Sequence, residues 1–158
     1  MKNEYVGDVN DFAKYALLKQ LAGMHVPERL RLGVNWYLTP DSGREGAKTS
    51  YLDRPQPNVF LGADSVLFRQ LRQLICEGRR SVFSVEADKL LPGDTVFFSE
   101  PVASIDRYVW SRRGGSALAA CDLVFLDPDN GLAELGRPPA AARAALEEVV
   151  PAYRGVKV

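Results

Sequence analysis

The sequence predicts an α/β fold in which helices alternate with the strands of a doubly wound, mostly parallel sheet. Residues 123–126 form an unbroken apolar run, which is typical of a strand buried on both faces of such a sheet. Residues 30–39 and 95–99 are also rich in β-forming residues. Helical stripes stand between these runs, as in Leu67, Leu71 and Leu74, which recur at helical spacing. Together these patterns favour α/β over an antiparallel sandwich.

The elements follow from local signals in chain order. Asp8 or Asn10 can cap a helix over residues 11–21, and Gly23 and Pro27 end it. The strand over residues 30–39 leads into a glycine-containing loop, and residues 51–62 are predicted as loop. The later elements are a helix opened by Asp64 or Ser65, strands at 81–86 and 95–99, a helix at 105–120 interrupted by Gly114 and Gly115, the strand at 123–126, and a helix from about 140 to 150 after Pro138 and Pro139.

The length of 158 residues predicts a single domain over residues 1–158. Val156–Val158 has the composition of a strand that is just beginning, so we expect a C-terminal truncation in which the last strands of the fold are missing. An incomplete sheet leaves an unpaired edge, which invites association. We therefore predict a homodimer, or additional chain in a longer parent protein.

Composition narrows the partners. The formal net charge is zero, so no overall field attracts nucleic acid or an anionic membrane. Nucleic acid would have to bind through local arginine patches, which are Arg69, Arg72, Arg79 and Arg80, and Arg107, Arg112 and Arg113. No apolar run could cross a bilayer and no signal peptide is present, which predicts a cytoplasmic protein without a membrane partner. Cys76 and Cys121 read as buried thiols, and the lone His25 lacks companions for a zinc site or a catalytic triad.

Three acids are predicted at or just after the ends of strands. Asp127 follows the strand at 123–126, and Pro128 then prevents further ladder pairing because it has no N–H. Asp41 and Glu86 follow the two earlier strands, and Gly43 lies in the loop with Asp41. Because parallel strands end at one edge of the sheet, where open α/β sheets bind ligands, the three acids predict a ligand crevice.

Two short motifs resemble a known family. Residues 11–15, Asp-Phe-Ala-Lys-Tyr, preceded by Gly7, are similar to the N-terminal signature of bacterial ribosomal-RNA adenine methyltransferases and to the opening of three-Cys-motif partner proteins. Residues 126–130, Leu-Asp-Pro-Asp-Asn, resemble the D-P-P-Y motif of those families. The resemblance implies the Rossmann-like fold of class I methyltransferases, with S-adenosylmethionine as the cofactor.

The resemblance also implies roles for single residues. It puts Lys14, Tyr15, Asp41 and Gly43 on the cofactor side and Glu86 at the ribose of the cofactor. Asp127 would face the reacting exocyclic amine of a nucleic-acid base, together with the carbonyl of Pro128. Asn130 replaces the aromatic of the motif, which removes a stacking platform worth about 1–3 kcal/mol for a flipped base.

Two other classes of function stay open at this point. A catalytically silent methyltransferase fold could serve as a binding or partner module. Alternatively, Asp127 and Asp129 could hold Mg²⁺ for phosphoester hydrolysis, since hard cations take carboxylate oxygens. Apart from that alternative, no metal site is predicted.

Overall fold

The computed structural model describes residues 1–23, 29–43, 48–53, 59–102, 106–133 and 143–153. The chain forms two compact units. Unit 1 contains Met1–Lys2, Glu28–Pro40 and Asp94–Val158, and unit 2 contains Asn3–Pro27 and Asp41–Gly93. Each unit is described by itself below, and the single domain over residues 1–158 stays a prediction.

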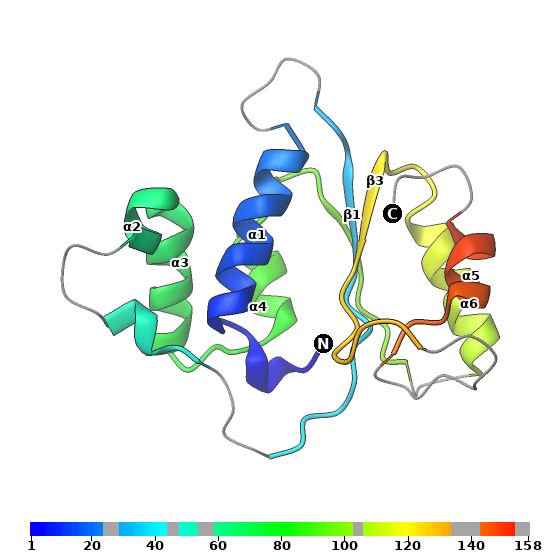
Figure 1. The fold of residues 1–158 in the computed structure, drawn as a ribbon, viewed down its shortest axis with the longest axis horizontal. Helices are drawn as coiled ribbons and strands as arrows, with labels where there is room; N and C mark the ends of the chain where they lie inside the picture. The colour runs from blue at the N-terminus through cyan, green and yellow to red at the C-terminus, as the bar shows by residue number, and fades with distance from the viewer. Residues whose placement is uncertain (24–28, 44–47, 54–58, 103–105, 134–142, 154–158) are drawn as a thin grey trace. The chain divides into compact units, whose positions relative to one another are not determined.

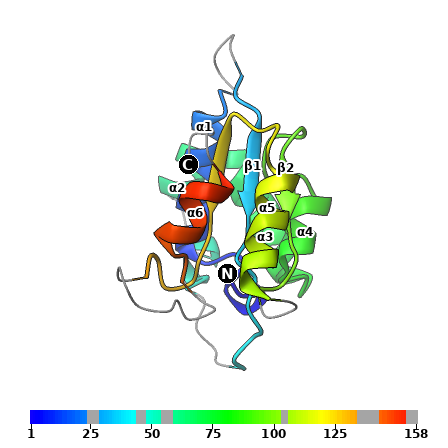
Figure 2. The ribbon, with the colours of Figure 1, turned by 90° about the vertical axis from the view of Figure 1, so that its right-hand side faces the viewer.

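Unit 1 is built on a small open sheet of three parallel strands, which are β1 (Leu32–Asn35), β2 (Val96–Phe98) and β3 (Leu123–Leu126). The strand order is β2-β1-β3, so β1 is central, with Gly33 opposite both Val96 and Val124. Helices α5 (Arg107–Ala117) and α6 (Leu146–Ala152) lie on one face of this sheet (Figures 1 and 2). The predicted α/β class with a parallel sheet is therefore confirmed in this smaller form.

The sheet alternates its side chains as the sequence pattern predicts. Successive residues of a strand point to opposite faces. Val124 and Phe98 belong to a buried cluster with Trp110 of α5 and Tyr153, which follows α6. On the other face, the rings of Trp36 and Phe97 stack with their centroids 5.9 Å apart. Both faces of the short sheet thus carry buried aromatic side chains.

Helices α5 and α6 approach each other closely at a pair of glycines. The sequence predicts that Gly114 and Gly115 interrupt a helix, but α5 runs through both. A Cβ atom on Gly115 would lie 2.4 Å from the carbonyl oxygen of Ala152 in α6, closer than real contacts allow. A Cβ atom on Gly114 would lie 3.0 Å from the hydroxyl of Tyr153. The two glycines therefore serve the contact between the helices.

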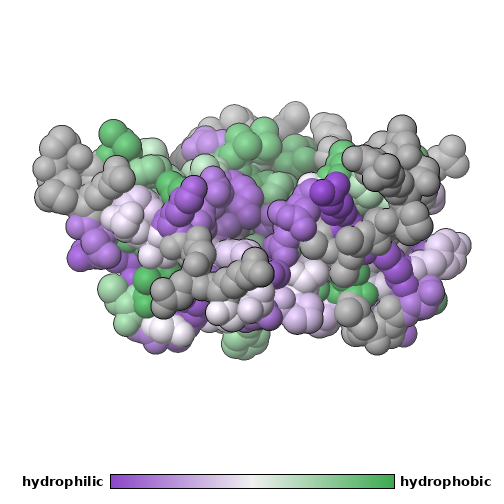
Figure 3. All heavy atoms as spheres, turned by 60° about the horizontal axis from the view of Figure 1, so that its bottom comes forward, coloured by the Kyte–Doolittle hydropathy of each residue, from purple (hydrophilic) through white to green (hydrophobic). Residues whose placement is uncertain are grey.

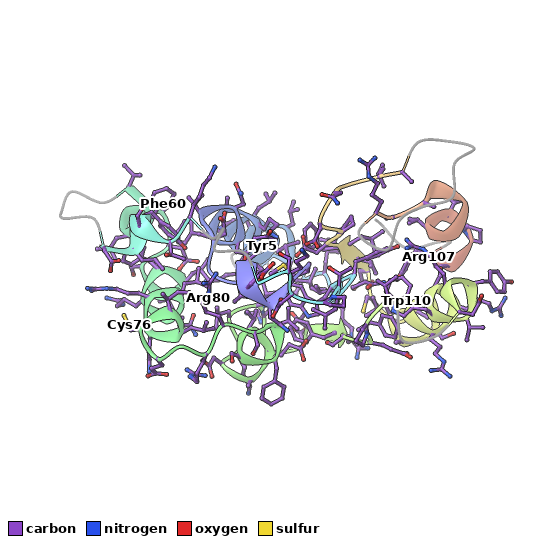
Figure 4. All side chains as sticks on the ribbon, turned by 90° about the horizontal axis from the view of Figure 1, so that it is seen from below. Tyr5, Phe60, Cys76, Arg80, Arg107 and Trp110 are labelled. Carbon is purple, nitrogen blue, oxygen red and sulfur yellow. The ribbon has the colours of Figure 1, made fainter. Side chains whose placement is uncertain are left out.

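Unit 2 is helical in the part that the structure describes. Its elements are the 3-10 helices η1 (Asn3–Tyr5) and η2 (Ser50–Asp53) and the helices α1 (Val9–Leu21), α2 (Val59–Ala63), α3 (Ser65–Cys76) and α4 (Val82–Ala87). The rings of Phe12, Tyr51 and Phe60 meet edge to face, with centroids 4.9–6.0 Å apart. Arg80, labelled with Phe60 in Figure 4, donates to the backbone carbonyl of Val6. This unit therefore has an aromatic core of its own.

Several predicted elements are confirmed. Asp8 caps α1 by accepting from the N–H of Asn10, and Asp64 caps α3 by accepting from the N–H of Leu67. The strand expected at 30–39 is confirmed over Leu32–Asn35 only, because Tyr37 adopts a positive φ of 46° that ends the extended backbone. The loop expected at 51–62 is wrong at both ends, where η2 and α2 form, and residues 54–58 lie outside the described residues. Cys121 is buried as expected, whereas Cys76 is exposed.

One predicted strand is wrong. Residues 81–86 were predicted as a short strand that ends in an acid, but Val82–Ala87 is helix α4. Ser81 caps this helix, since its hydroxyl accepts from the N–H of Ser84 at 3.1 Å. Val82 and Val85 are both buried, whereas Phe83 between them is 74% exposed, which is a helical rather than a strand spacing. Glu86 therefore does not follow a strand.

Two predicted features fall on residues that the structure does not describe. Pro138, Pro139 and the strand onset at Val156–Val158 are among the residues left undescribed. Within the described ranges, no helix is long and apolar enough to cross a bilayer. On the face shown in Figure 3, the coloured residues are mostly hydrophilic, with separate apolar groups among them.

Candidate functional site at the C-terminal edge of the sheet

The candidate site in unit 1 lies where the central strand and β3 end. The backbone N–H of Asp127 donates to the carbonyl of Asn35 at 2.9 Å, which extends the pairing of β3 with β1 by one residue. Asp127 is buried, and Pro128 ends the ladder as predicted. A turn follows at Asp129 and Asn130, and Gly131 has a φ of 68°. A carboxylate is thus held at the edge where parallel sheets bind ligands.

Asp129 turns its carboxylate back onto the ends of the strands. One oxygen lies 3.0 Å from the α-ammonium group of Met1. The other accepts a hydrogen bond from the hydroxyl of Thr39 at 2.8 Å. With a side chain only 12% exposed, Asp129 serves as an internal anchor for the segment after β1. This arrangement leaves both carboxylate oxygens already committed to partners.

The α-ammonium of Met1 is bound by three oxygens at this edge. It donates to the carbonyls of Tyr37 at 3.1 Å and Asp127 at 2.9 Å, in addition to its ion pair with Asp129. The carbonyl of Met1 accepts from the N–H of Thr39 at 2.9 Å. The edge therefore presents acceptors that bind a primary amine, which is a property that the sequence did not reveal.

The turn after β1 is strained and tightly held. Tyr37 is one of two non-glycine residues in the described chain with a positive φ, a conformation that is costly for a bulky side chain. Its N–H donates to the side-chain oxygen of the fully buried Asn35, whose amide nitrogen donates to the hydroxyl of Tyr153 at 2.7 Å. The ring of Tyr37 packs edge to face on Trp110, with centroids 4.7 Å apart. These contacts fix the direction of the Tyr37 carbonyl.

Sequence reasoning missed Asn35, Tyr37 and Thr39 as members of this site. The one available signal was the asparagine itself, because a polar residue within a buried apolar strand needs hydrogen-bond partners. Asp127, Pro128 and Asn130, which the sequence did predict, share one loop, and Asn130 is exposed. The N–H of Gly131 lies 3.5 Å from the carbonyl of Pro128, too far to engage that carbonyl strongly.

The residues assigned to the cofactor all lie in unit 2. Lys14 pairs with the buried Asp11 at 2.8 Å, and the other oxygen of Asp11 accepts from the N–H of Gly7 at 3.0 Å. Tyr15 is fully buried. Gly7 has a φ of 87° and packs against Ile75, so the motif that resembles the methyltransferase signature stabilises the start of α1.

A tyrosine near this motif has a perturbed acidity. The hydroxyl of Tyr51 donates to the carbonyl of Gly7 at 3.3 Å. Burial raises the pKa of Tyr51 above its ordinary value, and the negative charges of Asp11 and Asp8 raise it further. Tyr51 therefore stays a neutral hydrogen-bond donor well into the alkaline range.

The loop that contains Asp41 and Gly43 binds a carboxylate of the chain itself. The side chain of Glu4 accepts from the N–H and the hydroxyl of Ser42, at 3.0 and 2.5 Å, and from the N–H of Gly43 at 2.9 Å. In return, Asp41 accepts from the N–H of Glu4 at 3.1 Å. Gly43 has a φ of 70°, as backbone nests for anions require. The backbone N–H groups of this loop therefore bind an anion, and that anion is the side chain of Glu4.

The remaining residue assigned to the cofactor, Glu86, does not lie at the end of a strand as predicted. It lies in helix α4 and is partly buried, so the strand-end geometry that suggested a ribose contact does not exist. Among the described residues, no group of three or more His, Cys, Asp or Glu side chains could hold a metal ion. With Asp129 engaged by Met1 and Thr39, the pair Asp127 and Asp129 gives the hydrolase alternative no support.

Several arginines of the two predicted patches bind other side chains of the protein. Arg79 pairs with Glu77 and Asp88, both at 2.7 Å, and Arg113 pairs with Glu100 at 3.1 Å. Arg69 donates to the hydroxyl of Ser65.

Comparisons with family models, curated proteins and solved structures find no match to this chain.

Proposed function

We propose that the C-terminal edge of the unit 1 sheet binds the exocyclic amine of a nucleic-acid base, in the manner of a methyltransferase-like protein. The observation that carries this proposal is the position of Asp127, a buried carboxylate directly after β3 and beside the end of β1. In the loop that follows, the carbonyl of Pro128 is only weakly engaged. The carboxylate of Asp127 and the carbonyl of Pro128 are both acceptors for amino hydrogens.

The chemistry of an exocyclic amine explains why acceptors matter. Its lone pair is delocalised into the base, and acceptors that hold the two hydrogens favour a geometry in which the lone pair becomes available. At this edge the carbonyls of Tyr37 and Asp127 already accept from the α-ammonium of Met1, so the acceptors proposed for the base are the Asp127 carboxylate and the Pro128 carbonyl. Asn130, exposed on the same loop, would contact the edge of the base by hydrogen bonds where the motif has an aromatic.

The cofactor part of the proposal has weaker support. S-adenosylmethionine would supply a methyl group on a sulfonium, but the residues assigned to it do not form a seat for it. Glu86 lies in α4, the N–H groups of Ser42 and Gly43 hold Glu4, and Lys14 pairs with Asp11. Methyl transfer therefore rests on the two sequence motifs, and we derive no step through the cofactor.

A second candidate function is favoured by the internal contacts of the residues that were assigned to the cofactor. If the internal contacts of Glu4, Lys14 and Asp11 are permanent, the protein is a catalytically silent module that binds a base or a partner without turnover. Isothermal calorimetry with S-adenosylmethionine, S-adenosylhomocysteine and Mg²⁺ separates the classes. A methyltransferase binds both adenosyl compounds, a silent module binds neither, and heat with Mg²⁺ alone would revive the hydrolase.

A variant sharpens this test. In Glu4→Gln, the side chain loses its charge, so the N–H groups of Ser42 and Gly43 hold it less strongly. If the loop takes part in cofactor binding, Glu4→Gln binds S-adenosylhomocysteine at least as tightly as the wild type. Glu86→Ala is the matched control, because its position in α4 predicts no effect on that affinity. No heat from either protein would reject the methyltransferase and leave the silent module.

A further inference from the structure

The outer face of helix α5 carries an exposed aromatic ring beside two arginines, of which Arg113 pairs with Glu100 at 3.1 Å. Tyr108, Val109, Arg112 and Arg113 are exposed, whereas Trp110 and Ser111 face the interior. Tyr108 is 68% exposed, so most of its ring is open to solvent. No residue between Arg107 and Ala117 is acidic. This face, Tyr108–Val109–Arg112–Arg113, is called the α5 face below.

The exposed ring and the guanidinium of Arg112 are arranged together. The central carbon of Arg112 lies over the ring of Tyr108, 5.9 Å from its centroid, and a guanidinium nitrogen lies 3.5 Å from the Tyr108 hydroxyl. Such a contact orients the ring by a cation–π interaction. Because the ring is still mostly exposed, it offers a flat surface beside a positive charge.

The α5 face lies at the same end of unit 1 as the candidate site. Helix α5 follows β2, so its first turn lies toward the edge where the parallel strands end. Trp110 of α5 contacts the ring of Tyr37, whose carbonyl binds the Met1 ammonium together with the carbonyl of Asp127. Arg107 and Trp110, labelled in Figure 4, mark this part of the helix. An extended ligand that lies along α5 would therefore lead toward Asp127.

We propose that the α5 face binds single-stranded nucleic acid, with a base stacked on Tyr108 and a phosphate near Arg112, since Arg113 already pairs with Glu100. Aromatic platforms combined with basic side chains are the means by which proteins bind single strands with little sequence preference. The positive charge complements the phosphates, and the exposed ring complements an unstacked base. This inference rests on the proposed function, because it names the partner that would bring a base to Asp127.

The test is fluorescence anisotropy with a labelled single strand of about 12 nucleotides, within the usual site sizes of such proteins. Tyr108→Ala should weaken binding by roughly tenfold or more, whereas Tyr108→Phe, which keeps the ring, should retain it. Arg112→Gln should lower the affinity and reduce the dependence of log affinity on log salt by about 0.7, the effect of one phosphate contact to a single strand. Thermal unfolding of each variant checks that the helix remains intact.

Control variants and a control ligand distinguish binding at the α5 face from nonspecific electrostatic attraction. Arg72→Gln removes an exposed arginine from α3 in unit 2 and should leave the affinity unchanged. Equal losses in Arg72→Gln and Arg112→Gln, binding to polyglutamate as tight as to the oligonucleotide, or no binding by the wild type would each overturn the proposal. Asp127→Asn should keep the dependence on Tyr108. If instead adenosyl compounds do not bind but the oligonucleotide does, the cofactor proposal fails and the α5 face stands.

Discussion

The contact between α5 and α6 gives a sharp prediction for Gly115→Ala. In a solvent-exposed helix this change stabilises by about 1 kcal/mol, because alanine is the better helix former. Here the added Cβ atom would lie 2.4 Å from the Ala152 carbonyl oxygen, roughly 0.9 Å short of the approximately 3.3 Å of a close C···O contact. The obstacle is backbone, so α6 has to move. Overpacking of this kind costs about 1–3 kcal/mol, which cancels or exceeds the gain from alanine, and we expect a net loss of up to roughly 2 kcal/mol.

Urea unfolding followed by circular dichroism measures this loss. Ser116→Ala is the matched control, since Ser116 is exposed on the same helix and the change should stabilise slightly. Gly114→Ala should cost less than Gly115→Ala, because its neighbours are the side chains of Tyr153 and Phe98 rather than backbone. Stabilisation by Gly115→Ala equal to that of Ser116→Ala would refute the close approach of the two helices.

Three further predictions concern buried polar groups. Asp129→Asn should lower the free energy of unfolding by roughly 1.5–3 kcal/mol, because it removes the charge that faces the Met1 ammonium, and an unchanged urea midpoint would contradict this. Asn35→Leu should cost about 1–3 kcal/mol because it removes the hydrogen bond to the Tyr153 hydroxyl and the acceptor of the Tyr37 N–H, and a double-mutant cycle with Tyr153→Phe should show coupling between Asn35 and Tyr153. Tyr51 has a raised pKa, so the unfolded chain releases its proton first. Stability should therefore fall as pH rises above the ordinary value of 10.0, and Tyr51→Phe should flatten this alkaline decline in pH-dependent urea titrations.

The strands and caps of this chain could be predicted because their signals are local. The apolar run at Leu123–Leu126 and the carboxylate after it are enough to place Asp127 at the end of a parallel strand, although only Val124 of that strand is fully buried. The cap at Asp64 and the leucine spacing after it are likewise enough for α3. Such features depend on residues only a few positions apart.

The short segment at Ser81–Glu86 shows where local signals fail. Its apolar residues at positions 82, 83 and 85 fit a strand nearly as well as a helix, and six residues are too few for periodicity to decide. The cap by Ser81 and the burial of Val82 and Val85 decide for the helix in the structure. The assignment of Glu86 to a ribose contact depended on that strand, so it failed with it.

The binding contacts at the sheet edge could not be predicted for a different reason. The acceptors around the Met1 ammonium come from Tyr37, Asp127 and Asp129, which are separated from it by between 36 and 128 positions along the chain. The bond between Glu4 and Gly43 likewise joins residues 39 positions apart. Pairing at such separation is a property of the folded chain and leaves no periodic trace in the sequence.

The central claim is that the edge at Asp127 recognises an exocyclic amine, and an NMR titration of the backbone amides tests it most directly. Adenosine carries such an amine and uridine does not, so the two nucleosides form a matched pair of ligands. We predict that adenosine shifts the amides of Asp127, Asn130 and Gly131, that uridine leaves them in place, and that Asp127→Asn abolishes the adenosine response. Equal shifts with both nucleosides, or adenosine shifts confined to other parts of the chain, would contradict the account.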